Sequence, residues 1–199
     1  MKSLIFKPEL AQAIYEGRKT QTRRIIKPQA FSYAGAPIML VGYNDILGQN
    51  VICPVYKNGD FAEPKAIKPK FKIGDLFYVK ETYSTYAIPY MGVGGIAYKG
   101  AGNFLIEGYK WKSPLFMPEI LSRSICEITN VRTERLHDIS EQDAIAEGIE
   151  RKDPNTVTRY HHRGQFQIVW DEINTKRGFN WETNPWVWVY EFRKRDENE

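Results

Sequence analysis

The run at residues 184–192, NPWVWVYEF, constrains the fold more strongly than any other part of the sequence. Its aromatic and β-branched residues favour a β-strand, and apolar side chains occupy both of its alternating faces. A strand of this kind has to be covered on both sides, which excludes an edge strand exposed to water. The sequence therefore predicts a central strand here, with further strands on either side of it.

Further strand-like runs are spread along the chain, at residues 4–6, 51–56, 71–83, 95–99, 103–107 and 122–136. Residues 57–60, KNGD, form a turn signal that predicts a hairpin after the second of these runs. In the run at 71–83 successive side chains point to opposite faces, so Lys80 and Glu81 form a charged pair at the strand end. Residues 18–27 indicate an extended segment or loop.

Three helices are expected. The first begins at Pro8 and ends at Gly17, a residue suited to a helix C-terminus. The second has Ser140 as its N-cap and Asp143 at its third position, and it carries Glu147 in its last turn. The third has an apolar face at helical spacing, formed by Phe166, Val169, Trp170 and Ile173. Many strands with a few helices between them predict a mixed α+β domain built on a small curved or closed barrel.

The chain has 199 residues, of which 42% are hydrophobic and 26% charged. A chain of this length buries enough surface for one core without disulfide or metal support. Cys53 and Cys126 lie far apart in apolar runs, so we expect both to be small buried residues in a reducing compartment. There is no secretory signal pattern and no run near the ~20 apolar residues of a membrane span, so a cytoplasmic protein is expected.

The net charge of +4 conceals an asymmetry along the chain. Residues 1–30 carry an excess of five basic side chains, whereas the remaining residues carry an excess of one acidic side chain. Such a local excess attracts phosphate or another anion, although a solvated basic face is an equally good interpretation. The basic residues of this opening segment are Lys2, Lys7, Arg18, Lys19, Arg23, Arg24 and Lys27.

The segment at residues 17–24, GRKTQTRR, carries the most reactive combination of side chains. A lysine acts as a base or nucleophile when desolvation or neighbouring cations lower its pKa, and Lys19 has three arginines close to it in the sequence. A nearby threonine offers a hydroxyl that such a lysine can activate. Plain phosphate contacts and a solvated loop are alternative interpretations of the same residues.

Motifs for other chemistries are absent from the sequence. There is no P-loop, no serine nucleophile elbow and no zinc-protease motif. The three histidines, His137, His161 and His162, do not form a metal-ligand pattern. Neither a metal nor a cofactor is therefore expected.

Four blocks of the sequence together resemble the ASCH family and occur in the family's order, at residues 17–24, 73–82, 122–149 and 184–192. The larger ASCH proteins of phage and prophage genomes are the most similar, because they share the strand ending in Lys-Glu-Thr and the closing Asn-Pro-Trp-Val-Trp-Val. The resemblance implies a PUA-like small β-barrel with flanking helices. It also implies a single domain over residues 1–199 with insertions at about 28–70, 84–121 and 150–162.

The same resemblance implies a function on modified pyrimidines or RNA. PUA domains bind RNA, and some small ASCH proteins are amidohydrolases that remove the acetyl group from N4-acetylcytidine with a lysine, a threonine and a glutamate. Carried over by motif, these are Lys19, Thr22 and Glu147. In the implied reaction Lys19 takes a proton from the Thr22 hydroxyl, or from water, for attack on the acyl carbon, and Glu147 handles the proton of the departing amine.

Four more charged residues are expected to bind the substrate. Arg24, together with Arg23, would stabilise the oxyanion or fix the base, and Lys80 and Glu81 would line the pocket unless they are exposed strand charges. Aromatic residues of the insertions suit either base stacking or packing against the barrel, namely Tyr83, Tyr86, Tyr90 and Trp111.

The expected partner is a modified nucleoside, a nucleotide or RNA, with no membrane involved. Two alternatives to the amidohydrolase stand beside it. One is a non-catalytic RNA-binding module, in which Arg23 and Arg24 contact phosphate. The other is a ribonuclease in which Lys19 and Glu147 serve as base and acid.

Overall fold

The computed structural model describes residues 1–27, 29, 68–87, 94–102, 109–150 and 162–195 with their side chains. It describes the backbone alone at residues 32–33, 36–37, 39–44, 49–54, 88 and 93. The predictions for Cys53, Tyr90, His161 and the strand at 103–107 therefore lie outside the described side chains or residues. So does the predicted turn at 57–60.

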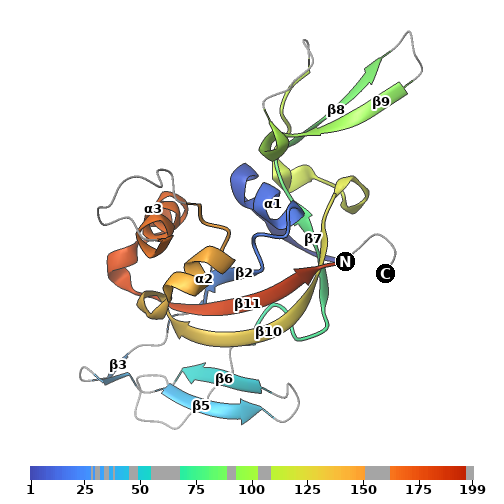
Figure 1. Cartoon of the computed structure of the whole chain (residues 1–199). Helices are drawn as coiled ribbons and strands as arrows, with labels where there is room; N and C mark the ends of the chain where they lie inside the picture. The colour runs from blue at the N-terminus through green and yellow to red at the C-terminus, as the bar shows by residue number, and fades with distance from the viewer. Residues whose placement is uncertain are drawn as a thin grey trace.

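The centre of the molecule is a curved five-stranded sheet (Figure 1) with the strand order β1–β7–β10–β11–β2. Its strands are β1 (Lys2–Ile5), β7 (Leu76–Lys80), β10 (Ile125–Arg135), β11 (Trp186–Lys194) and β2 (Gln21–Ile25). β1 and β7 are parallel, and every other neighbouring pair in this sheet is antiparallel. β11 lies between β10 and β2, which confirms the predicted central strand.

Both faces of β11 are buried, as its composition requires. Val187 and Val189 belong to one apolar cluster, with Leu136, Phe166 and Trp170. Side chains that alternate with these two belong to a second cluster with β1, β7 and the first helix, namely Trp188, Tyr190 and Phe192. Each large apolar side chain contributes about 1.5–3 kcal/mol when it is fully buried, so β11 supplies much of what holds the two clusters together.

Three α-helices accompany the sheet: α1 (Pro8–Tyr15), α2 (Glu141–Ala146) and α3 (His162–Asn174). Gly17 has a φ of 77° just beyond the end of α1, and Ser140 caps α2 by accepting a hydrogen bond from the backbone of Asp143, as predicted. The 3-10 turns are η1 (Lys99–Ala101), η2 (Pro114–Phe116), η3 (Glu119–Leu121), η4 (Leu136–Asp138), η5 (Thr175–Arg177) and η6 (Trp181–Thr183). α2 packs on α3, and α1 packs on η1.

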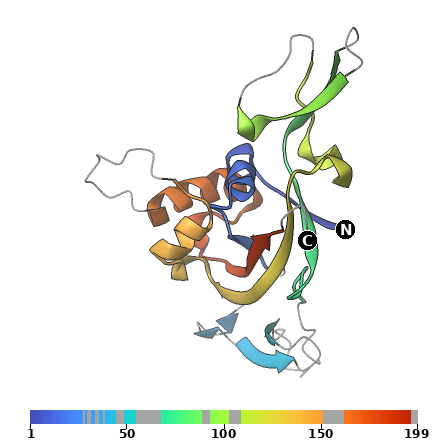
Figure 2. The same ribbon diagram turned by 45° about the vertical axis from the view of Figure 1, so that its right-hand side comes forward.

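The remaining strands form hairpins outside the main sheet. They are β3 (Ser32–Tyr33) with β4 (Ala36–Pro37), β5 (Met39–Asn44) with β6 (Gln49–Pro54), and β8 (Tyr83–Ile88) with β9 (Val93–Tyr98). The strand run predicted at 51–56 thus pairs with the strand before it, and the run predicted at 71–83 is divided between β7 and β8. Figure 2 shows the β5–β6 and β8–β9 hairpins at opposite ends of the molecule, and α1 between α3 and the second hairpin.

The predicted α+β class is confirmed, and the sheet is curved. Its edge strands are β1 and β2. A side chain joins these two edges, because Nη2 of Arg24 on β2 donates a hydrogen bond of 3.1 Å to the carbonyl of Ile5 on β1. No helix of the described part of the chain is long and apolar enough to span a membrane. Cys126 is fully buried, and burial raises the pKa of its thiol to about 12.

Candidate functional site

A cavity of about 540 Å³ lies beside β2, between the start of α1 and helix α3. Its volume falls in the range of about 300–1,000 Å³ that is typical of small-molecule sites. Five of the seven residues that the sequence singled out line it, namely Lys19, Thr22, Arg23, Arg24 and Glu147. The first four belong to β2 or to the loop that leads into it, and Glu147 is the C-cap of α2.

Lys19 and Glu147 form a buried ion pair in this cavity. Their side chains are about 1% and 5% exposed, and Nζ of Lys19 lies 2.6 Å from Oε2 of Glu147. The same ammonium donates hydrogen bonds of 2.8 Å to the carbonyls of Gln21 and Glu147, so all three of its N–H groups have acceptors. Burial lowers the pKa of Lys19, the negative charge of Glu147 opposes that change, and the guanidinium groups of Arg24 and Arg23 add to it.

The backbone explains how two residues so far apart in sequence come together. Gly148 has a φ of 77°, so it ends α2 and turns the chain directly behind Glu147. The amide of Thr20 donates a 2.8 Å hydrogen bond to the carbonyl of Ala146, which fixes the loop before β2 against the end of this helix. A Cβ at position 148 would lie 2.8 Å from Cβ of Lys19, so only glycine allows this close approach.

Arg23 holds Glu147 from the other side. Its Nη1 donates a 3.1 Å hydrogen bond to Oε1 of Glu147, and its Nε donates one of 2.7 Å to Glu134. Its Nη2 also lies 3.5 Å from the carboxylate of Asp143. The side chain of Arg23 is fully buried among these three acids. These contacts position Glu147, and because Arg23 also lines the cavity, its expected contact with the substrate stays a prediction.

Arg24 points to the opposite face of β2 and has fewer partners. Its guanidinium lies 4.9 Å from the centre of the Phe6 ring and makes the single hydrogen bond to Ile5 described above. Its Nε is buried without a hydrogen-bond partner among the described residues. Burial lowers the pKa of Arg24, Glu147 opposes the change, and the neighbouring charge of Arg177 lowers the pKa further.

Thr22 is buried and lines the same cavity as Lys19 and Glu147. Among the described residues, no hydrogen bond joins its hydroxyl to Lys19. The structure thus gathers the three expected reactive residues in one cavity and brings two of them into direct contact.

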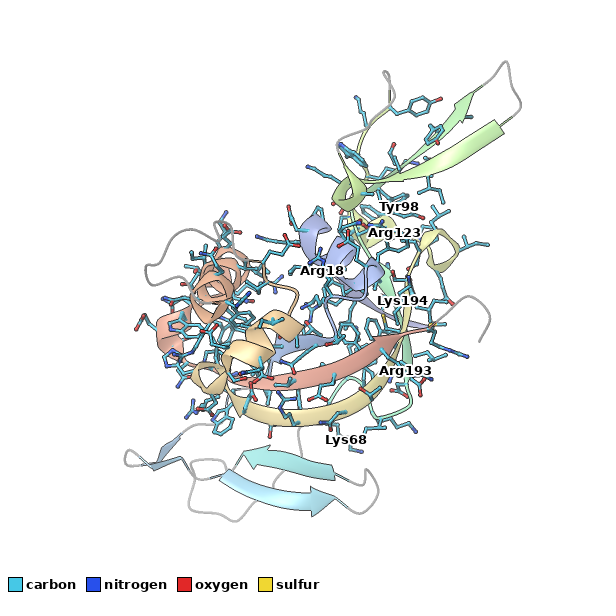
Figure 3. The ribbon with its side chains drawn as sticks, in the orientation of Figure 1. Arg18, Lys68, Tyr98, Arg123, Arg193 and Lys194 are labelled. Atoms are coloured by element: carbon cyan, nitrogen blue, oxygen red, sulfur yellow. The ribbon has the colours of Figure 1, made fainter. Side chains whose placement is uncertain are left out.

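Lys80 and Glu81 are not brought to this cavity, contrary to expectation. Glu81 is buried and accepts two hydrogen bonds from Arg123, of 2.8 and 2.9 Å. The guanidinium of Arg123 lies 4.5 Å from the ring centres of both Tyr15 and Tyr98, and Figure 3 shows it beside Tyr98 near the β8–β9 hairpin. Lys80 donates to the carbonyl of Leu115 at 2.9 Å. These contacts give the charged pair a structural role at the base of the hairpin.

The cavity also has lining residues that the sequence did not single out, among them Asn174 and Arg177. Asn174 is buried at the end of α3, four residues after Trp170 and eight after Phe166. The sequence signal for Asn174 was its polar side chain on the apolar face of this helix, because helical spacing of four places it beside Trp170. Arg177 lies in η5 and gave no signal, since a single exposed arginine after a helix is unremarkable.

Of the four aromatic residues considered for base stacking, the three that the structure describes lie elsewhere. Tyr83 is buried and donates a hydrogen bond to the carbonyl of Phe116, and the ring of Tyr86 packs edge-on against Tyr109. Neither these residues nor Trp111 line the cavity, whose aromatic residues are Phe6, Phe166 and Trp170. In the described part of the chain, no three His, Cys, Asp or Glu side chains are placed to hold a metal ion.

Comparisons with known proteins leave the family of the chain open. No family model matches it, and no curated protein matches it. A DUF984 protein from Enterococcus faecalis V583, EF3133, has a TM-score of 0.44 and 13% identity, over 98% of this chain and 82% of that one. An ASCH domain from Lactobacillus crispatus JV V101 has a TM-score of 0.39 and 12% identity, over 93% and 69%. At these scores neither structure carries an argument about function.

Proposed function

We propose that this chain is an amidohydrolase that removes the acyl group from an N4-acylated cytosine, with Lys19, Thr22 and Glu147 as its reactive side chains. The observation that carries the proposal is the 2.6 Å contact between Lys19 and Glu147 in a cavity that Thr22 also lines. These three residues provide a base, a hydroxyl nucleophile and an acid, which are the groups that amide hydrolysis uses. The motif match of Lys19, Thr22 and Glu147 to the reactive residues of the small ASCH amidohydrolases supports the same function.

The Lys19–Glu147 pair supplies both proton-transfer groups when one proton moves from Nζ to Oε2. That transfer converts the ion pair into a neutral amine and a carboxylic acid, and burial of Lys19, which lowers its pKa, favours the neutral amine. The amine then accepts the proton of the Thr22 hydroxyl, or of a water molecule, while the oxygen attacks the acyl carbon. Glu147 gives its proton to the cytosine nitrogen as the C–N bond breaks. With Thr22 as nucleophile, water then releases the acyl group from the ester.

Turnover of a panel of N4-acylcytosine nucleosides and nucleotides tests the proposal. The variant Lys19→Met removes the base, and we expect it to lower turnover by about 10²–10⁴-fold. Lys80→Met is the matched control, because Lys80 lies outside the cavity and donates only to a backbone carbonyl. Absence of turnover by the wild type on every substrate would contradict the proposal. An equal loss of turnover in the two lysine variants would also contradict it.

The hydrogen bonding of Lys19 favours a second candidate function, a non-catalytic module that binds an RNA base. All three N–H groups of Lys19 already have acceptors, which is the arrangement of a structural ion pair. To act as a base, the amine has to exchange one of these acceptors when the substrate enters. If Lys19→Met leaves RNA affinity unchanged and no acyl substrate is turned over, the binding module accounts for the cavity better.

A further inference from the structure

The proposed chemistry leaves several cations that line the cavity without a role. One of these cations, Lys7, already has a carboxylate partner, Glu172 of α3. Arg24, Lys27 and Arg177 also line the cavity, and none of the three has a carboxylate partner within the described part of the chain. Glu147 is the acidic residue that lines the cavity, and Lys19 and Arg23 already occupy its two oxygens.

Arg24 shows most clearly that a partner is missing. A guanidinium carries five N–H donors, and within the described part of the chain Arg24 uses one of them, toward the carbonyl of Ile5. Its buried Nε has no partner among the described residues. A buried cationic donor without a partner costs free energy, and an anion that accepts from it offsets that cost.

The three cations come from two parts of the chain that both line the cavity. Arg24 and Lys27 belong to β2 and the residues directly after it, and Arg177 ends η5 behind α3. Nζ of Lys27 lies 5.1 Å from the ring centre of Phe179, two residues beyond Arg177, so the end of β2 approaches this turn. The charge of Arg177 is also close enough to Arg24 to lower its pKa, which places two positive groups together. Lys27 and Arg177 are exposed, so the set lies where the cavity meets solvent.

We propose that Arg24, Lys27 and Arg177 form a phosphate subsite of this cavity, so that its ligand is a phosphorylated nucleotide rather than a free nucleoside. The identity of the base at the other end of the ligand rests on the proposed function. Guanidinium groups bind phosphate through paired, charge-assisted hydrogen bonds, and a lysine adds a mobile positive charge. The phosphate belongs either to a mononucleotide or to an RNA strand, and the experiment below separates these two sources.

Titration calorimetry with cytidine, cytidine 5′-monophosphate, a short cytidine-containing RNA and inorganic phosphate tests the subsite. We expect the monophosphate to bind at least tenfold more tightly than cytidine. Arg177→Gln should remove most of this difference, because it deletes one charge-assisted contact. Lys176→Gln is the matched control, since Lys176 is the exposed neighbour in η5 and does not line the cavity. Arg24→Gln gives an independent variant of the partly buried member of the set.

Equal affinities for cytidine and its monophosphate would overturn the subsite, and so would equal losses in Arg177→Gln and Lys176→Gln. Tighter binding of RNA than of the monophosphate, lost in Arg177→Gln, supports the subsite with an RNA strand as the source. Equal binding of the two supports it with a mononucleotide as the source. The phosphate effect without turnover of any N4-acylcytosine would retain the subsite and contradict the hydrolase. Turnover with no preference for phosphorylated substrates would retain the hydrolase and contradict the subsite.

Discussion

At the scale of single residues, the site depends on one carboxylate shared by two cations. Lys19 contacts one oxygen of Glu147, and Arg23 contacts the other. Arg23 is itself fixed by Glu134 and Asp143, so the orientation of Glu147 is set by acids that do not line the cavity. Removing one member of a buried charge network leaves an unpaired charge and costs about 3–5 kcal/mol. Variants of this network therefore need a stability measurement beside every activity measurement.

Asp143 gives this network a dependence on acid. Burial raises the pKa of Asp143, but hydrogen bonds from Ser140 and Gln21 and the charge of Arg23 together hold it at about 2. Because this pKa lies below the ordinary value, the stabilisation is present above about pH 4 and is lost as the pH falls toward 2. We expect wild type to lose about 1 kcal/mol more than Asp143→Asn over that window, after allowance for solvent screening.

Urea unfolding at a series of pH values measures this difference. Glu150→Gln is the control, because Glu150 is an exposed carboxylate whose surface ion pair with Arg18 contributes little. Parallel losses of stability in wild type and Asp143→Asn between pH 4 and pH 2 would show that Asp143 is not the group responsible.

At the scale of elements, the sequence predicts the strands and helix ends that neighbouring residues determine. Neighbouring residues determine the apolar faces of β11 and the ends of α1 and α2, and the sequence predicts all three elements. The contact of Lys19 with Glu147 spans 128 positions and came from the family resemblance rather than from spacing. The burial of Glu81 was not predictable, because it depends on Arg123, which comes from a loop 42 residues later. Alternation along a strand gives the face of a residue but not its partner.

Gly148 connects the end of helix α2 to the position of Lys19 in the site. An added Cβ would lie 2.8 Å from Cβ of Lys19 and 2.9 Å from Cβ of Ala13, in addition to the strain of its positive φ. We expect Gly148→Ala to destabilise the protein by about 2 kcal/mol or more and to displace Lys19 from Glu147. Gly17→Ala is the matched control, because Gly17 has the same φ of 77° behind α1 and no atom within 4 Å of the added Cβ.

Thermal unfolding and turnover of both glycine variants measure the two effects. The control should lose about 1 kcal/mol from backbone strain alone and keep its activity. If the two variants behave alike in stability and activity, the close approach of Gly148 to Lys19 has no functional consequence.

At the scale of the whole molecule, the basic opening segment is less available than its composition suggests. Five of its seven cations have ion-pair partners: Lys2 with Asp75, Lys7 with Glu172, Arg18 with Glu16 and Glu150, Lys19 with Glu147, and Arg23 with Glu134, Asp143 and Glu147. Arg24 and Lys27 have none among the described residues, and Arg177 joins them from η5. The unpaired positive charge of this opening segment thus lies at one cavity.

This distribution predicts a shallow salt dependence for binding to single-stranded RNA. Binding through the three cavity cations alone corresponds to a slope of about −2 when the logarithm of the association constant is plotted against the logarithm of the salt concentration. Fluorescence anisotropy with a labelled oligonucleotide at increasing salt measures this slope. A slope of about −5 would mean that cations outside the cavity also bind phosphate, which would contradict binding localised at the cavity.

The central claim is that the Lys19–Glu147 pair performs the chemistry, and turnover of N4-acetylcytidine or its 5′-phosphate by two carboxylate variants tests it most directly. Glu147→Gln and Glu134→Gln both remove an acid that contacts Arg23, but Glu147 alone contacts Lys19 and lines the cavity. We predict that Glu147→Gln loses about 10²–10⁴-fold in turnover while Glu134→Gln stays within tenfold of wild type. Equal losses in the two variants, or no turnover by the wild type, would contradict the claim.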